Sequence, residues 1–467
     1  MNGAIALIAR REVTEFVRDG RLLWAGGLVL LLTLAALAVG WQQQRAIDAE
    51  RIAAQALDYD DWVSQTTRHP HDAAHQGMHV FKPEPPLSIV DPGIGPYVGS
   101  TIWLQAHRQS EMKFRPAQDA TGLQRFGNLS VAWVLQILGP LLVIVLGFNA
   151  FAGEREQGTL RQTLSLGVPA SRILWGKALA LGGSLALLLA PIAIVAVLAM
   201  LTAEGSDRAD TIMRFGWIVV AYLLYFATTI FLVLAVSARA SSSRLALIVL
   251  LGAWIAGVTL APRLAADLAR LANPSPNRIE FNSGLDSELA HAQERAWTEE
   301  FGVGIPWSPQ VPLNKWGRAL ELDDHTAYGV IDKHFTGLWD SFDRQQRVQE
   351  WPGLVLPLLA LRGFSMGFAG TDFAHHRDFS IAAEQQRRLM QNLISHDLVE
   401  HADPLGNQHF SYKAGADLWK RVPRFTYTAP SAWHALQDNA RSLAVLVAGC
   451  VLAALLALAM TRRPLMR

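Results

Sequence analysis

The sequence predicts an all-α membrane protein with six transmembrane helices and a mixed, mainly helical extracytoplasmic domain formed by two insertions. Hydrophobic residues make up 51% of the 467 residues, and they gather in runs of about 20, roughly the length that crosses a bilayer. None of these runs contains Asp, Glu, Lys or Arg. The predicted spans are residues 22–41, 130–151, 178–202, 215–236, 245–262 and 442–461.

Residues 1–21 precede the first span and interleave apolar side chains with arginines such as Arg10, Arg11 and Arg18. This pattern is typical of an amphipathic helix in the headgroup layer, and a merely solvated positive leader is the alternative. Ala36-Leu37-Ala38 resembles a signal-peptide cleavage site. However, the apolar run is longer than in a signal peptide, and the leader contains acidic residues. We therefore expect an uncleaved anchor.

Positive side chains gather before the first span, between the second and third, between the fourth and fifth, and after the sixth. Because Lys and Arg mark cytoplasmic segments, we expect both termini, including the tail 462–467, in the cytoplasm. Trp351–Phe368 is a rival seventh span, but it contains Pro352, Pro357 and Arg362 and would move the tail outside. We expect this segment to pack on the membrane surface or in a domain core.

The two insertions, residues 42–129 and 263–440, then face away from the cytoplasm. In the first we expect helix at 42–62 and 114–128, with short β-favouring runs such as Leu87–Val90 between prolines. In the second, helical patterns cover residues 263–271, 287–301, 326–347 and 378–398. The insertions differ in length and content, which argues against an inverted-repeat secondary transporter.

All fourteen histidines lie in these insertions, and four of them cluster as His69, His71, His75 and His79. The pairs 71/75 and 75/79 have the spacing that aligns side chains on one helix face. Neutral imidazole is a common ligand of zinc and copper, so a metal site is one interpretation. The alternative is that Pro70 and Gly77 break the helix and leave solvated or hydrogen-bonded loop histidines.

A second histidine pair, His375 and His376, follows Gly370-Thr371-Asp372. Adjacent side chains lie about 100° apart on a helix, so this pair cannot readily share one metal ion. Asp372 and Thr371 are instead predicted to cap the helix that follows. The sequence contains no nucleophile elbow, zinc-protease motif or Cys/His pairing, so we expect no catalytic residue.

Several absences narrow the function. A net charge of +1 gives no field that attracts nucleic acid. The single cysteine, Cys450, excludes an internal disulfide and a cysteine-built metal site. No P-loop motif occurs, so we expect no nucleotide hydrolysis by that route. The spans contain no ionisable group of the kind that ion-coupled carriers keep there. Energy for transport would therefore come from another subunit.

The notable polar residues within the spans are Gln136, Asn149, Tyr222 and Tyr225. They are interpreted as contacts between helices or as residues of a substrate pathway. The connection at 152–177 begins as a charged amphipathic segment in which leucines recur at helical spacing. It suits a cytosolic elbow that receives mechanical input from a soluble partner. An ordinary charged hairpin is the alternative.

These features together resemble an ABC-2-type permease, the membrane subunit of an ATP-binding-cassette transporter. The leader Arg10-Arg11-Glu12 is similar to the family's elbow helix. The run from Phe151 through Glu154-Arg155-Glu156 and Gly158-Thr159-Leu160 is similar to its first cytoplasmic loop, and the order of six spans agrees. A further likeness is to a subgroup with large periplasmic insertions, related to the nitrous oxide reductase maturation permease. It rests on Phe81-Lys82-Pro83, Asp91-Pro92-Gly93 and Gly370-Thr371-Asp372.

The resemblance implies an ABC-2 exporter fold in the bacterial inner membrane, as a homodimer or paired with a similar permease. It implies no cofactor in this chain, because a separate ATPase subunit binds ATP and Mg²⁺. We also expect contact with membrane lipid, and a periplasmic or outer-membrane protein is a candidate partner. The family's coupling helix corresponds to Glu154–Leu166. The residues implied to contact the ATPase are Glu154, Arg155, Glu156, Gly158, Thr159, Leu160 and Leu164.

The function so implied is a permease that couples ATP hydrolysis in the partner to export or to conformational work outside the cytoplasm. Two alternatives remain open. One is a mechanotransmission protein that moves no cargo, and the other is a membrane-anchored metal-binding module built on the histidines.

Overall fold

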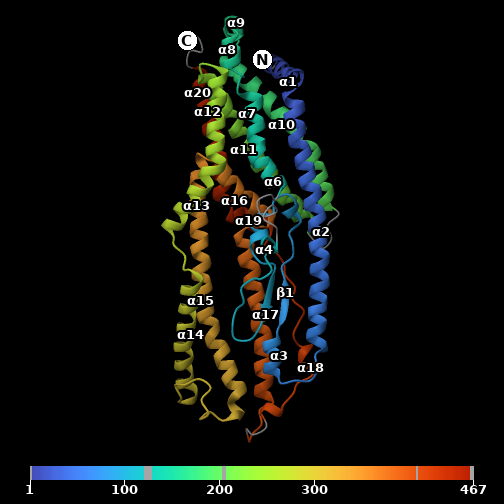
Figure 1. The fold of residues 1–467 in the computed structure, drawn as a ribbon, viewed down its shortest axis with the longest axis vertical. Helices are drawn as coiled ribbons and strands as arrows, with labels where there is room; N and C mark the ends of the chain where they lie inside the picture. The colour runs from blue at the N-terminus through green and yellow to red at the C-terminus, as the bar shows by residue number, and fades with distance from the viewer. Residues whose placement is uncertain (1–2, 120–128, 202–206, 406–408, 463–467) are drawn as a thin grey trace.

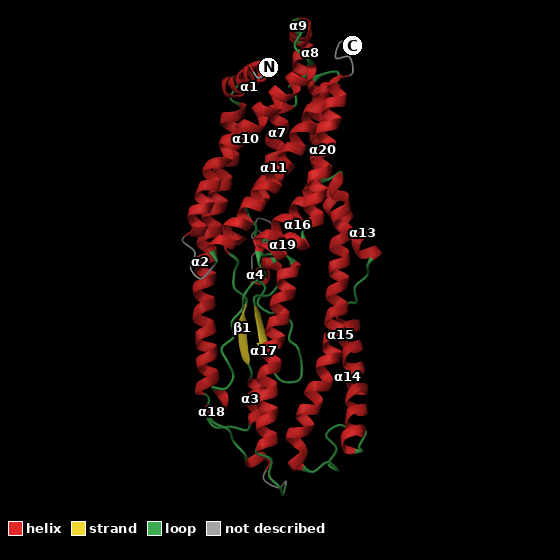
Figure 2. Ribbon diagram, turned by 180° about the vertical axis from the view of Figure 1, so that it is seen from behind, coloured by secondary structure: helices red, strands yellow, loops and turns green. Residues whose placement is uncertain are grey.

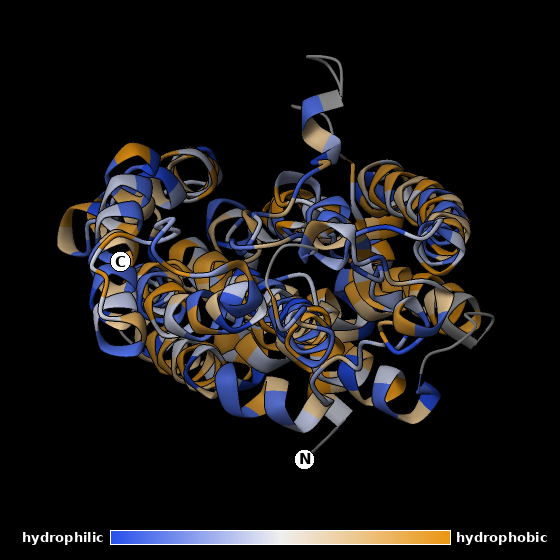
Figure 3. Ribbon diagram, turned by 90° about the horizontal axis from the view of Figure 1, so that it is seen from below, coloured by the Kyte–Doolittle hydropathy of each residue, from blue (hydrophilic) through white to orange (hydrophobic). Residues whose placement is uncertain are grey.

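The computed structural model describes residues 3–119, 129–201, 207–405 and 409–462. The molecule is elongated, with the candidate spans at one end and most of the two insertions at the other (Figure 1). Within the described residues, six helices are long and apolar enough to cross a membrane, which confirms the predicted class. They cover Leu22–Ser64, Val131–Glu156, Ala170–Leu198, Arg208–Arg239, Ser243–Ala272 and Ala440–Arg462. Seen along the long axis, most helices appear as rings, so they run nearly parallel to it (Figure 3).

The amphipathic leader forms α1 (Gly3–Arg18), and the first span is a π-helical turn (Leu22–Gly26) followed by α2 (Gly27–Ser64). α2 is one continuous helix of 38 residues, about 57 Å at 1.5 Å per residue. It therefore joins the apolar half of the molecule to the insertions (Figure 1).

The second span is interrupted. It consists of α6 (Val131–Trp133), a π segment (Val134–Leu138) and α7 (Gly139–Gly147). The next helices are short, α8 (Ala152–Glu156) and α9 (Thr159–Ser165).

The remaining spans are α10 (Ala170–Leu201), α11 (Arg208–Arg239), α12 (Ser243–Ile255) with a π turn (Ala256–Leu260), and α20 (Ala440–Arg462). The fifth span continues through that turn into α13 (Ala261–Ala272). α10 begins eight residues before the predicted span at 178, because Pro169 ends the preceding turn and an uninterrupted helical run follows. The stretch 170–177 is thus helix rather than loop.

The first insertion contains α3 (Pro70–Gln76), β1 (Met78–Phe81), β2 (Thr101–Leu104) and α4 (Pro116–Asp119). The strands pair antiparallel, with Met78 opposite Leu104 and Phe81 opposite Thr101. The expected β run at Leu87–Val90 is wrong. The 3₁₀ turn Pro86–Ile89 occupies it, because Pro85 and Pro86 lack the N–H groups that a ladder needs. A second 3₁₀ turn spans Gly95–Tyr97. The helix expected at 114–128 includes α4, and its residues 120–128 lie outside the described residues.

The second insertion is dominated by three long helices, α14 (Arg278–Phe301), α15 (Trp316–Glu350) and α17 (Phe373–Glu400). Shorter elements are the 3₁₀ turns Leu313–Lys315 and His409–Ser411, α18 (Ala416–Trp419) and α19 (Ala432–Asp438). α14 begins at a capping box formed by Asn277 and Glu280.

Both insertions contribute to one hydrophobic cluster, and the α14–α15 pair has a separate cluster of its own. Trp62 from the end of α2, Leu104 from β2 and Phe379 from α17 are buried in the same cluster. Trp62 Nε1 donates to the carbonyl of Trp419, 3.0 Å away. Viewed from behind, the hairpin lies between α2 and α17, while α14 and α15 form a separate pair (Figure 2). We name this region the insertion domain.

The segment Trp351–Phe368 is not a span. It forms a 3₁₀ turn (Trp351–Leu354) and α16 (Pro357–Ala369). Thirteen residues give about 20 Å of helix, which is shorter than a bilayer core. Phe364 and Phe368 are fully buried in the same cluster as the spans. α16 therefore packs inside the core, against α11 and α20.

Candidate functional site

The expected coupling segment lies at the end of the molecule that carries both termini (Figure 1). It is two helices, α8 and α9, rather than one. Gly158 separates them with φ of +75°, a left-handed conformation that favours glycine. We name residues 152–166 the lever.

The lever has one inward and one outward face. Leu160 is 1% exposed and joins the core of the spans, whereas Leu166 is 82% exposed. Arg161, Gln162 and Ser165 are also exposed. Of the leucines predicted to contact a partner, Leu160 thus faces this chain's own core, and Leu164 is partly buried against it. Leu166 is the apolar side chain presented outward.

A buried ion pair network fixes the base of the lever. Lys177 Nζ lies 2.6 Å from Glu12 Oε1 on α1 and 3.0 Å from Glu154 Oε1 on α8. Lys177 is 1% exposed and Glu12 5%. Burial raises the pKa of Glu12, an effect that the ammonium group opposes. We name these three residues the charge joint, because they connect α1, the lever and the third span.

Two further charged residues of the lever contact the fourth and fifth spans. The Arg155 guanidinium donates to the carbonyls of Ala238 and Ala240, each at 2.6 Å. The Glu156 carboxylate accepts from the Ser243 hydroxyl at 2.7 Å and from its amide at 3.0 Å. The side chains of Glu154, Arg155 and Glu156 therefore hold the lever to its own bundle. Thr159 acts within the lever, since its hydroxyl donates to the Glu154 carbonyl at 3.2 Å and so ties α9 to α8.

The polar residues of the spans contact other parts of the same chain. Gln136 Nε2 donates to the Tyr222 hydroxyl at 3.1 Å, and the Tyr225 hydroxyl donates to the Gln136 carbonyl at 2.8 Å. The Arg362 side chain on α16 donates to Gln136 Oε1 at 3.2 Å.

At the other end of the second span, Asn149 Oδ1 accepts from Arg21 at 3.0 Å. These geometries match the interpretation as contacts between segments of the bundle.

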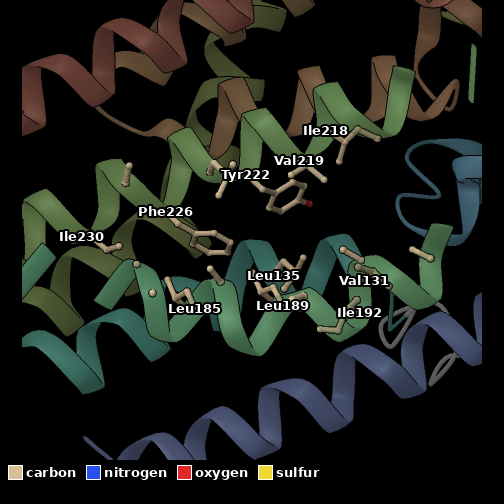
Figure 4. A pocket seen from close by; sticks show the side chains of 18 of the residues that line it. Val131, Leu135, Leu185, Leu189, Ile192, Ile218, Val219, Tyr222, Phe226 and Ile230 are labelled. Carbon is tan, nitrogen blue, oxygen red and sulfur yellow. The ribbon is translucent and has the colours of Figure 1, made fainter. Parts of the chain in front are cut away.

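An apolar cavity of about 610 Å³ lies between α10 and α11. Leu185, Leu189 and Ile192 of α10 face Ile218, Tyr222 and Phe226 of α11, and Val131 and Leu135 close one side (Figure 4). Such a lining suits hydrocarbon rather than an ion or a charged solute. Tyr222 is the one predicted pathway residue that lines this cavity.

Two sequence motifs, Asp91-Pro92-Gly93 of the first insertion and Gly370-Thr371-Asp372 of the second, meet where the spans join the insertion domain. The Thr371 hydroxyl donates to the Asp91 carbonyl at 3.0 Å, and the Ser365 hydroxyl donates to Asp91 Oδ2 at 2.5 Å. A Cβ added at Gly93 would lie 2.4 Å from Thr371 Oγ1. We name Asp91, Gly93, Ser365 and Thr371 the collar.

Asp372 caps α17 as predicted, with its carboxylate accepting from the His375 amide at 3.1 Å. The capping role predicted for Thr371 is wrong, because its hydroxyl contacts Asp91.

The four histidines that cluster in the sequence do not form one site in the structure. Pro70 begins α3 and Gly77 ends it, so His71 and His75 keep their helical alignment, with Nε2 atoms 3.1 Å apart. His79 falls on β1, and its Nδ1 lies 2.8 Å from Asp58 Oδ1. His69 packs against His409.

His107 joins His71 and His75 from the turn after β2. Burial, assisted by the neighbouring imidazoles, lowers the pKa of His71 to about 3 and that of His107 to about 4.

Sequence reasoning missed the charge joint and His107. Glu12 and Lys177 are 165 positions apart, and neither periodicity nor spacing connects charges across two helices. His107 stands alone in the sequence, and only the pairing of β2 with β1 brings it back to α3.

The fold and this geometry define a multi-pass membrane protein with a terminal lever and a large insertion domain. The chain belongs to the ABC-2 transporter family, since residues 6–300 match the model described as ABC-2 family transporter protein. That family supplies membrane components of ATP-binding-cassette transporters, which pair with an ATPase subunit. Residues 291–428 match a domain of unknown function (DUF3526). No curated protein matches the chain by sequence.

Proposed function

We propose that this chain is the permease subunit of an inner-membrane ABC transporter, in which the lever takes up the stroke of a separate ATPase. The charge joint is the observation that carries the proposal. A buried lysine between two carboxylates from different helices makes the lever, α1 and α10 move as one body. Opening the joint would leave a charge buried without a partner, which costs about 3–5 kcal/mol.

The contact surface for the ATPase is the outward face of α9 and the turn at Gly158. Leu166 would supply the apolar contact, and Arg161 and Gln162 the polar ones, since all three are exposed. Glu154, Arg155 and Glu156 would instead transmit force into the bundle through Lys177, the end of α11 and the start of α12. The proposal thus assigns anchoring to three of the residues predicted to contact the ATPase, and it assigns docking to exposed residues that were not predicted.

We propose that the ATPase stroke changes the position of the insertion domain. α2 is continuous from the apolar half to Trp62 in the core of that domain. α1 is linked to α2 through residues 19–26 and is held by the charge joint, so tilting at one end would move the other. With the lever in the cytoplasm, the insertion domain lies in the periplasm, where it would engage a periplasmic or outer-membrane partner.

The apolar cavity between α10 and α11 supports export of an apolar group, such as a lipid chain, as one form of that work. A homodimer, or a pair with a similar permease, would bring two such chains together. The subgroup related to the nitrous oxide reductase maturation permease remains the proposed affiliation, on the motifs that meet in the collar.

The docking surface is tested by photocrosslinking in cells. A benzoylphenylalanine at Leu166 is expected to form an adduct with a protein that mass spectrometry identifies as an ABC ATPase. The matched control places the same residue at Leu405, which is 83% exposed in the insertion domain. An adduct with the ATPase from position 405 but none from position 166 would overturn the proposal.

A further inference from the structure

Three imidazoles converge on the surface of the insertion domain, away from the lever. His71 and His75 come from α3 and His107 from the turn after β2, and their nitrogen atoms lie within 4.8 Å of one another. The Nε2 atoms of His71 and His75 are 3.1 Å apart. Two nitrogens on one tetrahedral zinc ion, at about 2.0–2.1 Å each, would be roughly 3.3 Å apart. The pair therefore already has ligand spacing.

The local fold builds this arrangement. Pro70 at the start of α3 and Gly77 at its end confine the helix to two turns that carry both histidines. The Ala106 amide donates to the Ala74 carbonyl at 3.0 Å, which ties the turn after β2 to α3. His107 itself has φ of +67°. This left-handed conformation is unfavourable for a residue with a Cβ, and such strain collects at functional sites.

The environment suits a borderline divalent cation. Three imidazole nitrogens are a ligand set for Zn²⁺ or Cu²⁺ rather than for Mg²⁺ or Ca²⁺, which prefer oxygen. His75 is exposed while His71 and His107 are partly buried, so an ion has a route from solvent. The next residue, Arg108, pairs with Asp286 of α14 at 3.0 Å. An ion here would therefore sit beside the contact between the first insertion and the helical pair.

A second group of potential metal ligands has atoms close enough in space for one ion, and it consists of Asp397, Glu400 and His401. Its Asp397 already accepts from the Tyr412 hydroxyl at 2.8 Å and faces Arg421 at 3.7 Å. Because those partners occupy and neutralise the carboxylate, this group is the weaker candidate for a metal ion.

We infer that His71, His75 and His107 bind one Zn²⁺ or Cu²⁺ ion through three imidazole nitrogens and leave a coordination position open. An open position is typical of sites that exchange a ligand, whereas structural zinc sites close with four protein ligands. The site does not depend on the ATPase, so it stands or fails separately from the proposed function.

The test uses the full-length chain, purified in detergent through a tag that contains no histidine, stripped with chelator and then dialysed against ZnCl₂ or CuSO₄. One tightly held equivalent per chain is expected, with nitrogen hyperfine structure in the copper EPR spectrum. His75→Ala and His107→Ala should each weaken binding by at least about tenfold, since even the loss of an outer-shell partner costs 10–100-fold. The matched control is His291→Ala, on α14 and largely exposed, which should leave affinity unchanged.

His75 is exposed, so its replacement is not expected to disturb folding, and the melting temperature without metal checks this. Unchanged affinity in His107→Ala would mean that the helical pair alone binds ions adventitiously, and it would overturn the three-ligand site. Absence of a saturable equivalent in the unmodified chain would overturn it as well. Equal weakening by His291→Ala would show nonspecific binding and have the same consequence.

Discussion

The charge joint and the collar stabilise the two ends of the same helical bundle through different interactions. The charge joint uses a buried lysine between two carboxylates, and these come from helices distant in sequence. The collar uses hydrogen bonds to Asp91 and a close approach of backbone at Gly93, where φ is +49°. One end is thus stabilised by ion pairs, and the other by hydrogen bonds and close steric packing.

The two kinds of contact are expected to tolerate different displacements when the lever moves. A buried ion pair resists separation but tolerates small rotations, because an ammonium group has three equivalent donors on a flexible stem. A backbone contact at a positive φ tolerates almost no displacement without a clash. We therefore expect movement to enter through the charge joint and the collar to pass it on as a rigid element.

The largest effect is expected from Lys177→Met. Removing the ammonium leaves Glu12 and Glu154 facing each other in a buried place, and stability should fall by about 3 kcal/mol or more. Thermal unfolding in detergent measures it. The comparison is sharpened by combining Glu12→Gln, Lys177→Met and Glu154→Gln, which removes all the charges together. This neutral variant should regain most of the lost stability. A neutral variant as unstable as Lys177→Met would contradict the electrostatic origin of the joint.

Gly93→Ala is expected to be next in size, at about 2 kcal/mol, because the added Cβ would lie 2.4 Å from Thr371 Oγ1 at a left-handed φ. Hydrogen exchange should increase around residues 365–372 and stay unchanged in the lever. The control is Gly95→Ala, whose Cβ would meet nothing within 4 Å. Equal effects of the two substitutions would refute the steric account of the collar.

The smallest effect is a pH dependence confined to the insertion domain. Burial raises the pKa of Asp323 to about 6, and its Oδ1 accepts from Trp297 Nε1 at 2.7 Å. The folded state then holds a proton more tightly than the unfolded state. This stabilising contribution is complete below about pH 4 and is lost as the pH rises through 6.

Asp323→Asn keeps an acceptor for Trp297 and removes the titration. The melting temperature of the variant should fall less between pH 4 and 6 than that of the unmodified chain. The neighbouring Asp324, also with a pKa of about 6, is expected to leave a residual slope. An unchanged slope in Asp323→Asn would assign the dependence to other groups.

Much of the fold was predictable, since uncharged runs of about 20 residues admit few structures other than membrane spans. The segment Trp351–Phe368 was harder, because Pro352, Pro357 and Arg362 exclude a span without revealing that Phe364 packs among the spans. The lever was predictable as a segment from its charges and leucines. The division of its side chains was not, since Leu160 and Leu166 differ in burial only once α9 has packed. The partners of Lys177 were equally hidden, because pairing across 165 positions depends on tertiary structure.

The central claim is that the charge joint carries the ATPase stroke to the insertion domain. It is tested by electron-electron distance measurement in the reconstituted complex with the ATPase. Spin labels at Glu50→Cys on α2 and Glu299→Cys on α14, both exposed, are introduced in a Cys450→Ser background. ATP with vanadate should shift the distance distribution relative to the nucleotide-free complex, and the neutral variant of the joint should lose this shift. The same shift in both proteins, or none in the unmodified joint, would contradict the account.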